Sequence, residues 1–228
     1  MQSNYIPWKG YFDMINMVDE FILFDSVQYV KKNWRNRNKI KNVNGTQWLT
    51  IPVIVKDRFN QYICDTYVCD GYWRGKHLKT IKMTYQKAAH FSEYEEQLEE
   101  IYLSSTEKNL SLINKSFIEG INKMLGIDTR ITFASDYGYV HTKGNNESIL
   151  KLAKDAGAST LLNGPKAMEY MMDEQFAEVG IDLVWMDYSG YPEYHQLYGK
   201  FEHAITVLDL IINEGPNATK FMKSFHGS

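Results

Sequence analysis

A run of basic and amide side chains at residues 31–41 carries the residue types best suited to hold an anion. It reads Lys-Lys-Asn-Trp-Arg-Asn-Arg-Asn-Lys-Ile-Lys, with six basic residues, three asparagines and no acid. Cationic and amide side chains bind phosphate through charge-assisted hydrogen bonds. We therefore expect a diphosphate to be neutralised here by Lys31, Lys32, Arg35, Arg37 and Lys39. A solvated charged loop is the alternative interpretation of the same run.

Amide and aromatic side chains around this run are suited to enclosing the rest of such a ligand. Aromatic residues make up 14% of the chain, and aromatic side chains often line pockets for flat ligands, although they also simply pack in cores. We expect hydrogen bonds to sugar or base groups from Asn4, Gln28, Asn36 and Asn38. We expect apolar walls from Trp8, Tyr11, Trp34 and Trp48.

General acid–base chemistry needs a titratable side chain at the site, and Asp25 and His77 are the first candidates. Asp25 ends an apolar run, where a base, a metal ligand or an ion-pair partner of a neighbouring arginine all fit. His77 and Lys79 belong to a segment that opens a long predicted helix, although a single histidine is often structural. Tyr11 is a third catalytic candidate, with a core position as its alternative.

Two further segments complete the predicted site. Asn163 and Gly164 follow a short apolar segment, where they form either part of a binding edge or only a tight turn. The chain has no metal-binding spacing of histidines or cysteines, no Walker A loop and no GxGxxG or GxSxG motif, so we expect no metal site. Cys64 and Cys69 do not lie at a strand-to-helix turn and are expected to be reduced, without a nucleophilic role.

The elements that would position these residues alternate between strands and helices. Apolar periodicity predicts a helix over 8–18, a strand over 20–25, strands over 47–55 and 61–69 that form a hairpin-like excursion, and a long helix over 76–104 with a break near residue 91. Further on, it predicts helices over 107–125, 145–156, 165–179 and 203–214, and strands over 130–135, 159–162 and 182–186.

This alternation is typical of an α/β fold with a mainly parallel sheet between two helical layers. We expect one α/β domain over residues 1–228, with a small β excursion and a helical pair inserted at about 45–125. In such a sheet, ligands gather at the carboxyl ends of the strands. The first turn falls close to Met1, which leaves open whether native residues precede it.

Composition limits the partners and the location of the protein. The formal net charge is −3, so a general nucleic-acid-binding surface is not expected. No apolar run reaches the length of a membrane span and no signal peptide is recognisable, so we expect a cytoplasmic protein. The aromatic residues allow a homodimer without requiring one.

Several motifs together resemble the WbqC-like family. They are Gln2-x-Asn-Tyr-x-Pro-Trp-x-Gly-Tyr-Phe-Asp13, Asp25-x-x-Gln28, Asn36-Arg-Asn-x-Ile40, Gln47-Trp-Leu-Thr-x-Pro-Val53, Tyr191-Pro-x-Tyr-x-Gln196 with Phe201, and Leu208-Asp-Leu with Asn213-x-Gly215. Through this resemblance Tyr194 and Gln196 are also counted among the binding residues. The family occurs in bacterial surface-polysaccharide gene clusters, such as those for the O-antigen of lipopolysaccharide, which implies a role in making or decorating an activated sugar.

A more distant likeness concerns the first turn, which resembles the nucleotide-binding turn of HIGH-motif nucleotidyltransferases such as pantothenate synthetase. Trp8 and Tyr11 stand where that family has its two histidines, which puts adenylyl transfer in doubt. The leading hypothesis is a transferase that modifies an amino or hydroxyl group on a nucleotide-linked sugar. An acyl or aminoacyl donor would suit an amino sugar. The alternatives are an ATP-dependent ligase or adenylyltransferase that needs magnesium, and a non-catalytic sugar-nucleotide-binding protein.

Overall fold

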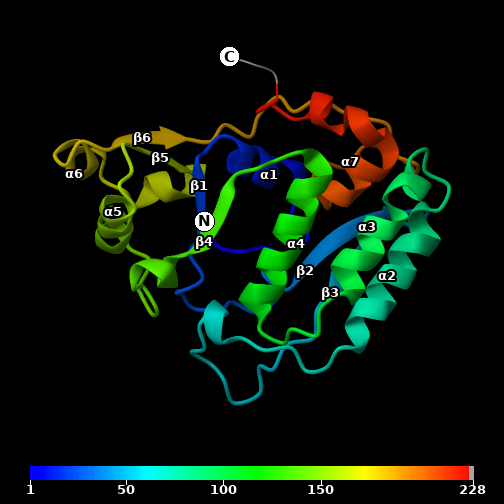
Figure 1. The fold of residues 1–228 in the computed structure, drawn as a ribbon, viewed down its shortest axis with the longest axis horizontal. Helices are drawn as coiled ribbons and strands as arrows, with labels where there is room; N and C mark the ends of the chain where they lie inside the picture. The colour runs from blue at the N-terminus through cyan, green and yellow to red at the C-terminus, as the bar shows by residue number, and fades with distance from the viewer. Residues whose placement is uncertain (226–228) are drawn as a thin grey trace.

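The computed structural model describes residues 1–225 and confirms the predicted α/β class (Figure 1). In chain order, the α-helices and strands are α1 (Lys9–Asn16), β1 (Glu20–Leu23), β2 (Arg37–Asn42), β3 (Gly45–Thr50), α2 (Tyr72–Tyr85), α3 (Phe91–Leu103), α4 (Leu110–Leu125), β4 (Arg130–Phe133), α5 (Asn146–Asp155), β5 (Thr160–Asn163), α6 (Asp173–Ala177), β6 (Asp182–Trp185) and α7 (Val207–Glu214). Short 3₁₀ helices add η1 (Ile63–Asp65), η2 (Ala134–Tyr137), η3 (Pro165–Glu169) and η4 (Gly215–Phe221).

The parallel strands form two pairs, β1 with β4 and β5 with β6. The first residue of the chain lies beside β1 like a strand residue, because its amino group donates to Ile22 O at 3.2 Å and its carbonyl accepts from Phe24 N at 2.8 Å. Its side chain reaches toward Gly164 at the end of β5, where an added Cβ would lie 3.2 Å from Met1 Cε. Met1 therefore lies between the two parallel pairs.

The basic run does not form a simple loop, because its second half is strand β2. This strand pairs antiparallel with β3, from Arg37 opposite Thr50 to Asn42 opposite Gly45. A tight turn at Val43 and Asn44 joins the strands, and the φ of +107° at Gly45 explains why glycine follows it.

The hairpin-like excursion predicted for strands 47–55 and 61–69 is confirmed only in part. Strand β3 pairs with β2 and ends at Thr50, just before Pro52, which cannot donate to a ladder. The two predicted segments meet only in an isolated antiparallel bridge between Val53 and Val68, beside which Ile54 N donates to Tyr67 O at 2.9 Å. The rest of the second segment contains η1 and makes isolated bridges to Gln28 and Asn109.

Helices α2, α3 and α4 lie together on one side of the molecule, away from β5 and β6 (Figure 1). The predicted break in the long helix is confirmed by the interval between α2 and α3. The helix predicted over 165–179 is divided into η3 and α6, and the last predicted helix begins only at Val207. There the Thr206 hydroxyl caps the helix by accepting a hydrogen bond from Leu208 N at 3.3 Å.

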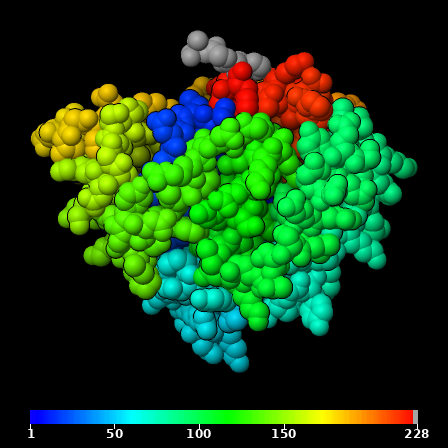
Figure 2. Space-filling view, viewed as in Figure 1, coloured from blue at the N-terminus to red at the C-terminus, as the bar shows by residue number. Residues whose placement is uncertain are grey.

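One large apolar core joins the first turn, β1, the β2–β3 hairpin, α2–α4 and α7, and a smaller core lies among α5, α6, β5 and β6. Figure 2 shows that α4 and its neighbouring segments cover the face in view, so the amino-terminal residues reach this surface in only a small area. Within residues 1–225, no helix is both long and apolar enough to cross a membrane.

Candidate functional site

A pocket of about 300 Å³ lies between the first turn of the chain, the start of β2 and the segment before α7. It is lined by Asn4, Pro7, Trp8, Trp34, Asn38, His203 and Ala204. Four of these seven residues, Asn4, Trp8, Trp34 and Asn38, are aromatic or amide residues that the sequence predicted to bind a ligand. The pocket therefore joins the two segments, the amino-terminal turn and the basic run, that the sequence analysis expected to meet.

The turn that forms one wall is conformationally strained. Ile6 is fully buried and has a φ of +36°, which is unfavourable for a β-branched residue and for one that precedes proline. The side-chain amide of Asn38 holds this turn by donating to Tyr5 O at 3.1 Å and to Ile6 O at 2.8 Å. Tyr5 N donates to Trp34 O at 3.0 Å. Buried hydrogen bonds from the basic run thus hold a strained backbone beside the pocket.

Trp8 forms a second wall and depends on the glycine that follows it. Its ring lies against Gly10, where an added Cβ would come within 2.4 Å of a ring carbon. On its other side the ring packs against Tyr188 and Tyr191, at centroid distances of 5.2 and 5.4 Å. Trp8 therefore fills the space that the absence of a side chain at Gly10 leaves.

The arginines of the basic run do not line the pocket but adjoin it through different neighbours. Arg35 donates to the side-chain oxygens of Asn4 and, at 2.9 Å, of Gln2. Burial lowers the pKa of Arg35, and the charge of Asp25 opposes that shift. Arg35 therefore joins the basic run to the amino-terminal segment through a pocket residue.

Arg37 lies on the outward face of β2, with its guanidinium 4.0 Å from the ring centroid of Trp48. Its Nη2 donates to Lys32 O, while its buried Nε has no hydrogen-bond partner among the described residues. Lys39 Nζ lies 5.3 Å from the same ring, and Trp48 packs against Trp34 of the pocket at 5.2 Å. An aromatic pair flanked by two cations therefore continues the pocket outward.

The first two residues of the basic run, Lys31 and Lys32, lie outside the pocket. Lys31 and Lys32 are exposed, and Lys31 Nζ lies 5.7 Å from the ring centroid of Phe59. Gln28 is also exposed and donates to Phe59 O at 3.2 Å. None of these three side chains lines the pocket.

Asp25 and Tyr11 are buried in the region beneath the first turn. Asp25 accepts from Ser3 N at 2.8 Å and from Ser3 Oγ at 2.6 Å, and only 1% of it is exposed. Tyr11 packs edge-on against Phe21 and donates to Gln2 O at 3.0 Å. Both residues hold the amino-terminal segment in place, and neither lines the pocket.

His77 lies in the core under the same turn. Its Nδ1 is 2.9 Å from Tyr5 Oη, and burial lowers its pKa from 6.5 to about 4. The imidazole is therefore neutral at neutral pH, and its low affinity for a proton makes it a weak general base. Lys79 is exposed on α2 and does not line the pocket.

Three further predicted residues, Asn36, Asn163 and Gly164, do not line the pocket. Asn36 accepts from Tyr29 Oη at 2.9 Å and donates to Ile51 O at 2.8 Å, so it links the segments that carry these two residues. Asn163 donates to Met171 Sδ at 3.1 Å, and Gly164 is buried near Met1. Neither Asn163 nor Gly164 lines the pocket.

Tyr194 and Gln196 belong to a buried polar network behind the pocket. Gln196 accepts from Lys41 Nζ at 2.7 Å and donates to Tyr194 Oη at 3.1 Å, and Tyr194 donates to Asp209 at 2.9 Å. Burial raises the pKa of Asp209 to about 6. The network fixes the 191–206 segment, which supplies His203 and Ala204 to the pocket.

Two residues near the pocket were missed by the sequence analysis. His203 is the only titratable residue among the seven that line it, and it is exposed. Lys9 is 3% exposed, donates to Pro192 O at 2.7 Å, and burial lowers its pKa to about 8. Neither residue stands in a motif with a known spacing, so only the fold could reveal them.

Comparison with known proteins supports the resemblance seen in the sequence. The family model of the WbqC-like protein family matches residues 2–221. A Mycobacterium tuberculosis protein described as "Uncharacterized protein Rv1507c" is 43% identical over 223 residues, which cover 98% of this chain and 96% of that protein. No solved structure gives a significant match, so the likeness to the HIGH-motif fold stays a prediction. The chain belongs to the WbqC-like protein family.

Proposed function

We propose that this protein is a transferase that modifies an amino or hydroxyl group on a nucleotide-linked sugar during the synthesis of a bacterial surface polysaccharide. The observation that carries the proposal is the pocket bounded by Trp8, Trp34 and Asn38, which continues into a rim of Trp48 and Arg37. Aromatic walls with cations at the edge suit a ligand that has flat rings and a diphosphate. The pathway follows from the setting that the family resemblance implies.

The two ends of the ligand would meet different parts of this site. Trp34 and Trp48 offer ring faces to a base or a sugar, and Arg37 and Lys39 beside them offer charge to the diphosphate. Asn4 and His203 lie in the pocket itself, where they can hydrogen-bond sugar hydroxyl or amino groups. The reacting sugar is therefore assigned to the pocket and the diphosphate to the rim.

His203 is the residue we assign as the general base. It would accept the proton of the sugar nitrogen or oxygen while that atom forms a bond to the acyl carbon of the donor, whose leaving group departs with the bonding electrons. Asp25 and His77 were the candidates from the sequence, but the first accepts two hydrogen bonds from Ser3 and the second is buried against Tyr5. Neither is placed to reach a ligand in the pocket.

The first experiment is a thermal-shift screen with UDP-glucose, UDP-N-acetylglucosamine, acetyl-coenzyme A, and ATP with Mg²⁺. We expect a rise in melting temperature with a nucleotide sugar, since a ligand that binds only the folded state stabilises it. Stabilisation by ATP with Mg²⁺ alone would replace the proposal with a ligase or adenylyltransferase.

The second experiment tests catalysis with the nucleotide sugar identified by the screen and an acyl donor, read by mass spectrometry of the product. His203→Ala should reduce turnover by roughly 10²–10⁴-fold, the usual contribution of a general base, while the affinity for the nucleotide sugar changes little. His195→Ala is the matched control, because His195 is exposed and lies outside the pocket lining. Binding without turnover in the wild-type protein would favour a carrier over an enzyme.

A further inference from the structure

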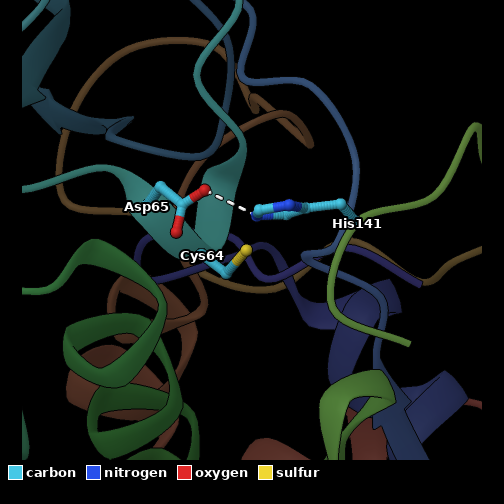
Figure 3. A group of neighbouring side chains, drawn as sticks. All are labelled: Cys64, Asp65 and His141. Atoms are coloured by element: carbon cyan, nitrogen blue, oxygen red, sulfur yellow. Dashed lines mark hydrogen bonds and ion pairs between the residues drawn. The ribbon is translucent and has the colours of Figure 1, made fainter. Parts of the chain in front are cut away.

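Three side chains with metal-binding atoms meet outside the pocket. Cys64 Sγ, the Asp65 carboxylate and the His141 imidazole lie within 4.8 Å of one another. Figure 3 shows the thiol of Cys64 and the carboxylate of Asp65 directed toward the His141 ring, and His141 Nε2 lies 2.8 Å from Asp65 Oδ2. Asp65 and His141 are 76 positions apart in the sequence, so no short motif could indicate the cluster.

The backbone around these side chains is fixed by the loop that follows β1. Cys64 N donates to Asp25 O at 3.1 Å, and Thr142 N donates to Ser26 O at 2.7 Å. One short loop thus holds η1 on one side and the segment that carries His141 on the other. The ligand atoms therefore come from two anchored segments, as a metal site requires.

The His141 ring is also oriented by an aromatic neighbour. Tyr62 stacks on it with a centroid distance of 4.1 Å and an interplanar angle of 15°. The stacking fixes the plane of the His141 ring, and Nε2 of that ring is directed at Asp65. An exposed ion pair by itself contributes little to stability and requires neither a thiol nor a stacked ring.

We propose that Cys64, Asp65 and His141 bind a single divalent transition-metal ion of the zinc type, with one coordination position left for water or another ligand. Sulfur, nitrogen and oxygen donors are the set that Zn²⁺ accepts, and three protein ligands with one open position are typical of non-structural zinc sites. Zn–N of about 2.0 Å and Zn–S of about 2.3 Å imply ligand separations of about 3.5 Å. The ligand atoms now lie within 4.8 Å of one another, so the side chains would move closer together on binding.

Metal binding at this cluster has a defined proton balance. The thiolate and not the thiol is the metal ligand, so a bound metal ion would take the place of the Cys64 thiol proton. Binding should therefore release a proton and strengthen as the pH rises.

The test is titration of the full-length protein with Co²⁺, followed by competition with Zn²⁺. We expect one equivalent of Co²⁺ to produce a thiolate-to-cobalt charge-transfer band, which Zn²⁺ then removes. Cys64→Ser should abolish the band, and His141→Ala should weaken binding at least about tenfold, by analogy with the loss expected on disturbing a metal site. Far-ultraviolet circular dichroism confirms that each variant is folded.

Cys69→Ser is the matched control, because Cys69 is an exposed cysteine on the same segment and is outside the cluster. The control should bind Co²⁺ like the wild-type protein, with the same band. Absence of the band in the folded wild-type protein would overturn the proposal and leave only a surface ion pair. Its persistence in folded Cys64→Ser, or its loss in Cys69→Ser, would overturn the ligand assignment.

Discussion

The two faces of β2 carry similar polar residues with different surroundings. The inward side presents Asn38 and, one residue before the strand, Asn36, at 3% and 6% exposure, and both donate to backbone carbonyls of other segments. The outward face presents Arg37 and Lys39, which lie over Trp48 and remain half-buried. Strand geometry alone separates them, because alternate side chains point to opposite sides.

The comparison teaches that residue type does not decide which polar side chains bind a ligand. The inward amides are already used to hold the strained turn at Ile6 and the loop that ends at Ile51. The outward cations lie over an aromatic surface, with the guanidinium of Arg37 4.0 Å and Lys39 Nζ 5.3 Å from the ring centroid of Trp48. Substitutions of the inward amides should therefore act mainly on stability, with Asn38 also lining the pocket, whereas substitutions of the outward cations should act on ligand affinity.

The largest effect is expected from Asn38→Ala. The substitution removes the donor for Tyr5 O and Ile6 O and leaves two buried carbonyls without a partner, which should cost roughly 2–4 kcal/mol of unfolding free energy. Urea denaturation measures this loss. Lys39→Ala on the outward face is the control and should change stability by less than about 0.5 kcal/mol. Equal effects of the two substitutions would refute the division between the faces.

The next largest effect concerns pH and His77, which supports the turn from below. Because burial lowers its folded-state pKa from 6.5 to about 4, the unfolded chain binds the proton more readily below pH 6.5. Its contribution to stability is therefore present above pH 6.5 and is lost as the pH falls toward 4. The loss between pH 7.5 and pH 5 should be roughly 2 kcal/mol.

Urea denaturation of the wild-type protein and of His77→Gln across this pH range isolates that contribution. The glutamine variant should show a smaller fall in stability toward pH 5, since it has no group to protonate at this position. Parallel pH profiles for the two proteins would contradict the assignment of His77 as a neutral core residue.

A smaller effect is expected from Gly10→Ala, which tests the wall formed by Trp8. Alanine would gain up to about 1 kcal/mol in helix propensity, but its Cβ would lie 2.4 Å from a carbon of the Trp8 ring. Overpacking of this kind costs about 1–3 kcal/mol, so we expect a net loss of about 1 kcal/mol and a changed tryptophan fluorescence.

Gly75→Ala is the matched control, because Gly75 lies in α2 with no atom within 4 Å of an added Cβ. This control should stabilise the protein slightly and leave the fluorescence unchanged. If Gly10→Ala behaved in the same way, Trp8 could not be held against Gly10 as described.

Much of the framework could be predicted from the sequence. Apolar periodicity located most of the helices and the strands that form parallel pairs, and the turn at Pro7 and the run at 31–41 do meet at one pocket. The alternation over 47–55 does not indicate the Asn44-Gly45 turn, which pairs β3 with β2 and leaves the two predicted segments joined only by an isolated bridge between Val53 and Val68.

The part of the site that could not be predicted depends on tertiary packing. His203 enters the pocket only because a buried network around Gln196 and Asp209 folds the preceding segment back. Asp25 is a candidate general base in the sequence, yet both of its carboxylate oxygens accept hydrogen bonds from Ser3, which is distant along the chain. No local pattern in the sequence indicates that His203 enters the pocket or that Asp25 is held by Ser3 away from it.

Isothermal titration of a nucleotide sugar, such as UDP-glucose or the one selected by thermal shift, into the wild-type protein, Arg37→Ala and Lys31→Ala tests the central claim most directly. Arg37→Ala should weaken binding about tenfold, a loss of about 1.4 kcal/mol, without changing stability, because it removes one charge-assisted contact. Lys31→Ala should bind like the wild-type protein, since Lys31 lies over Phe59 outside the pocket. Unchanged affinity in Arg37→Ala, or an equal loss in Lys31→Ala, would contradict the account.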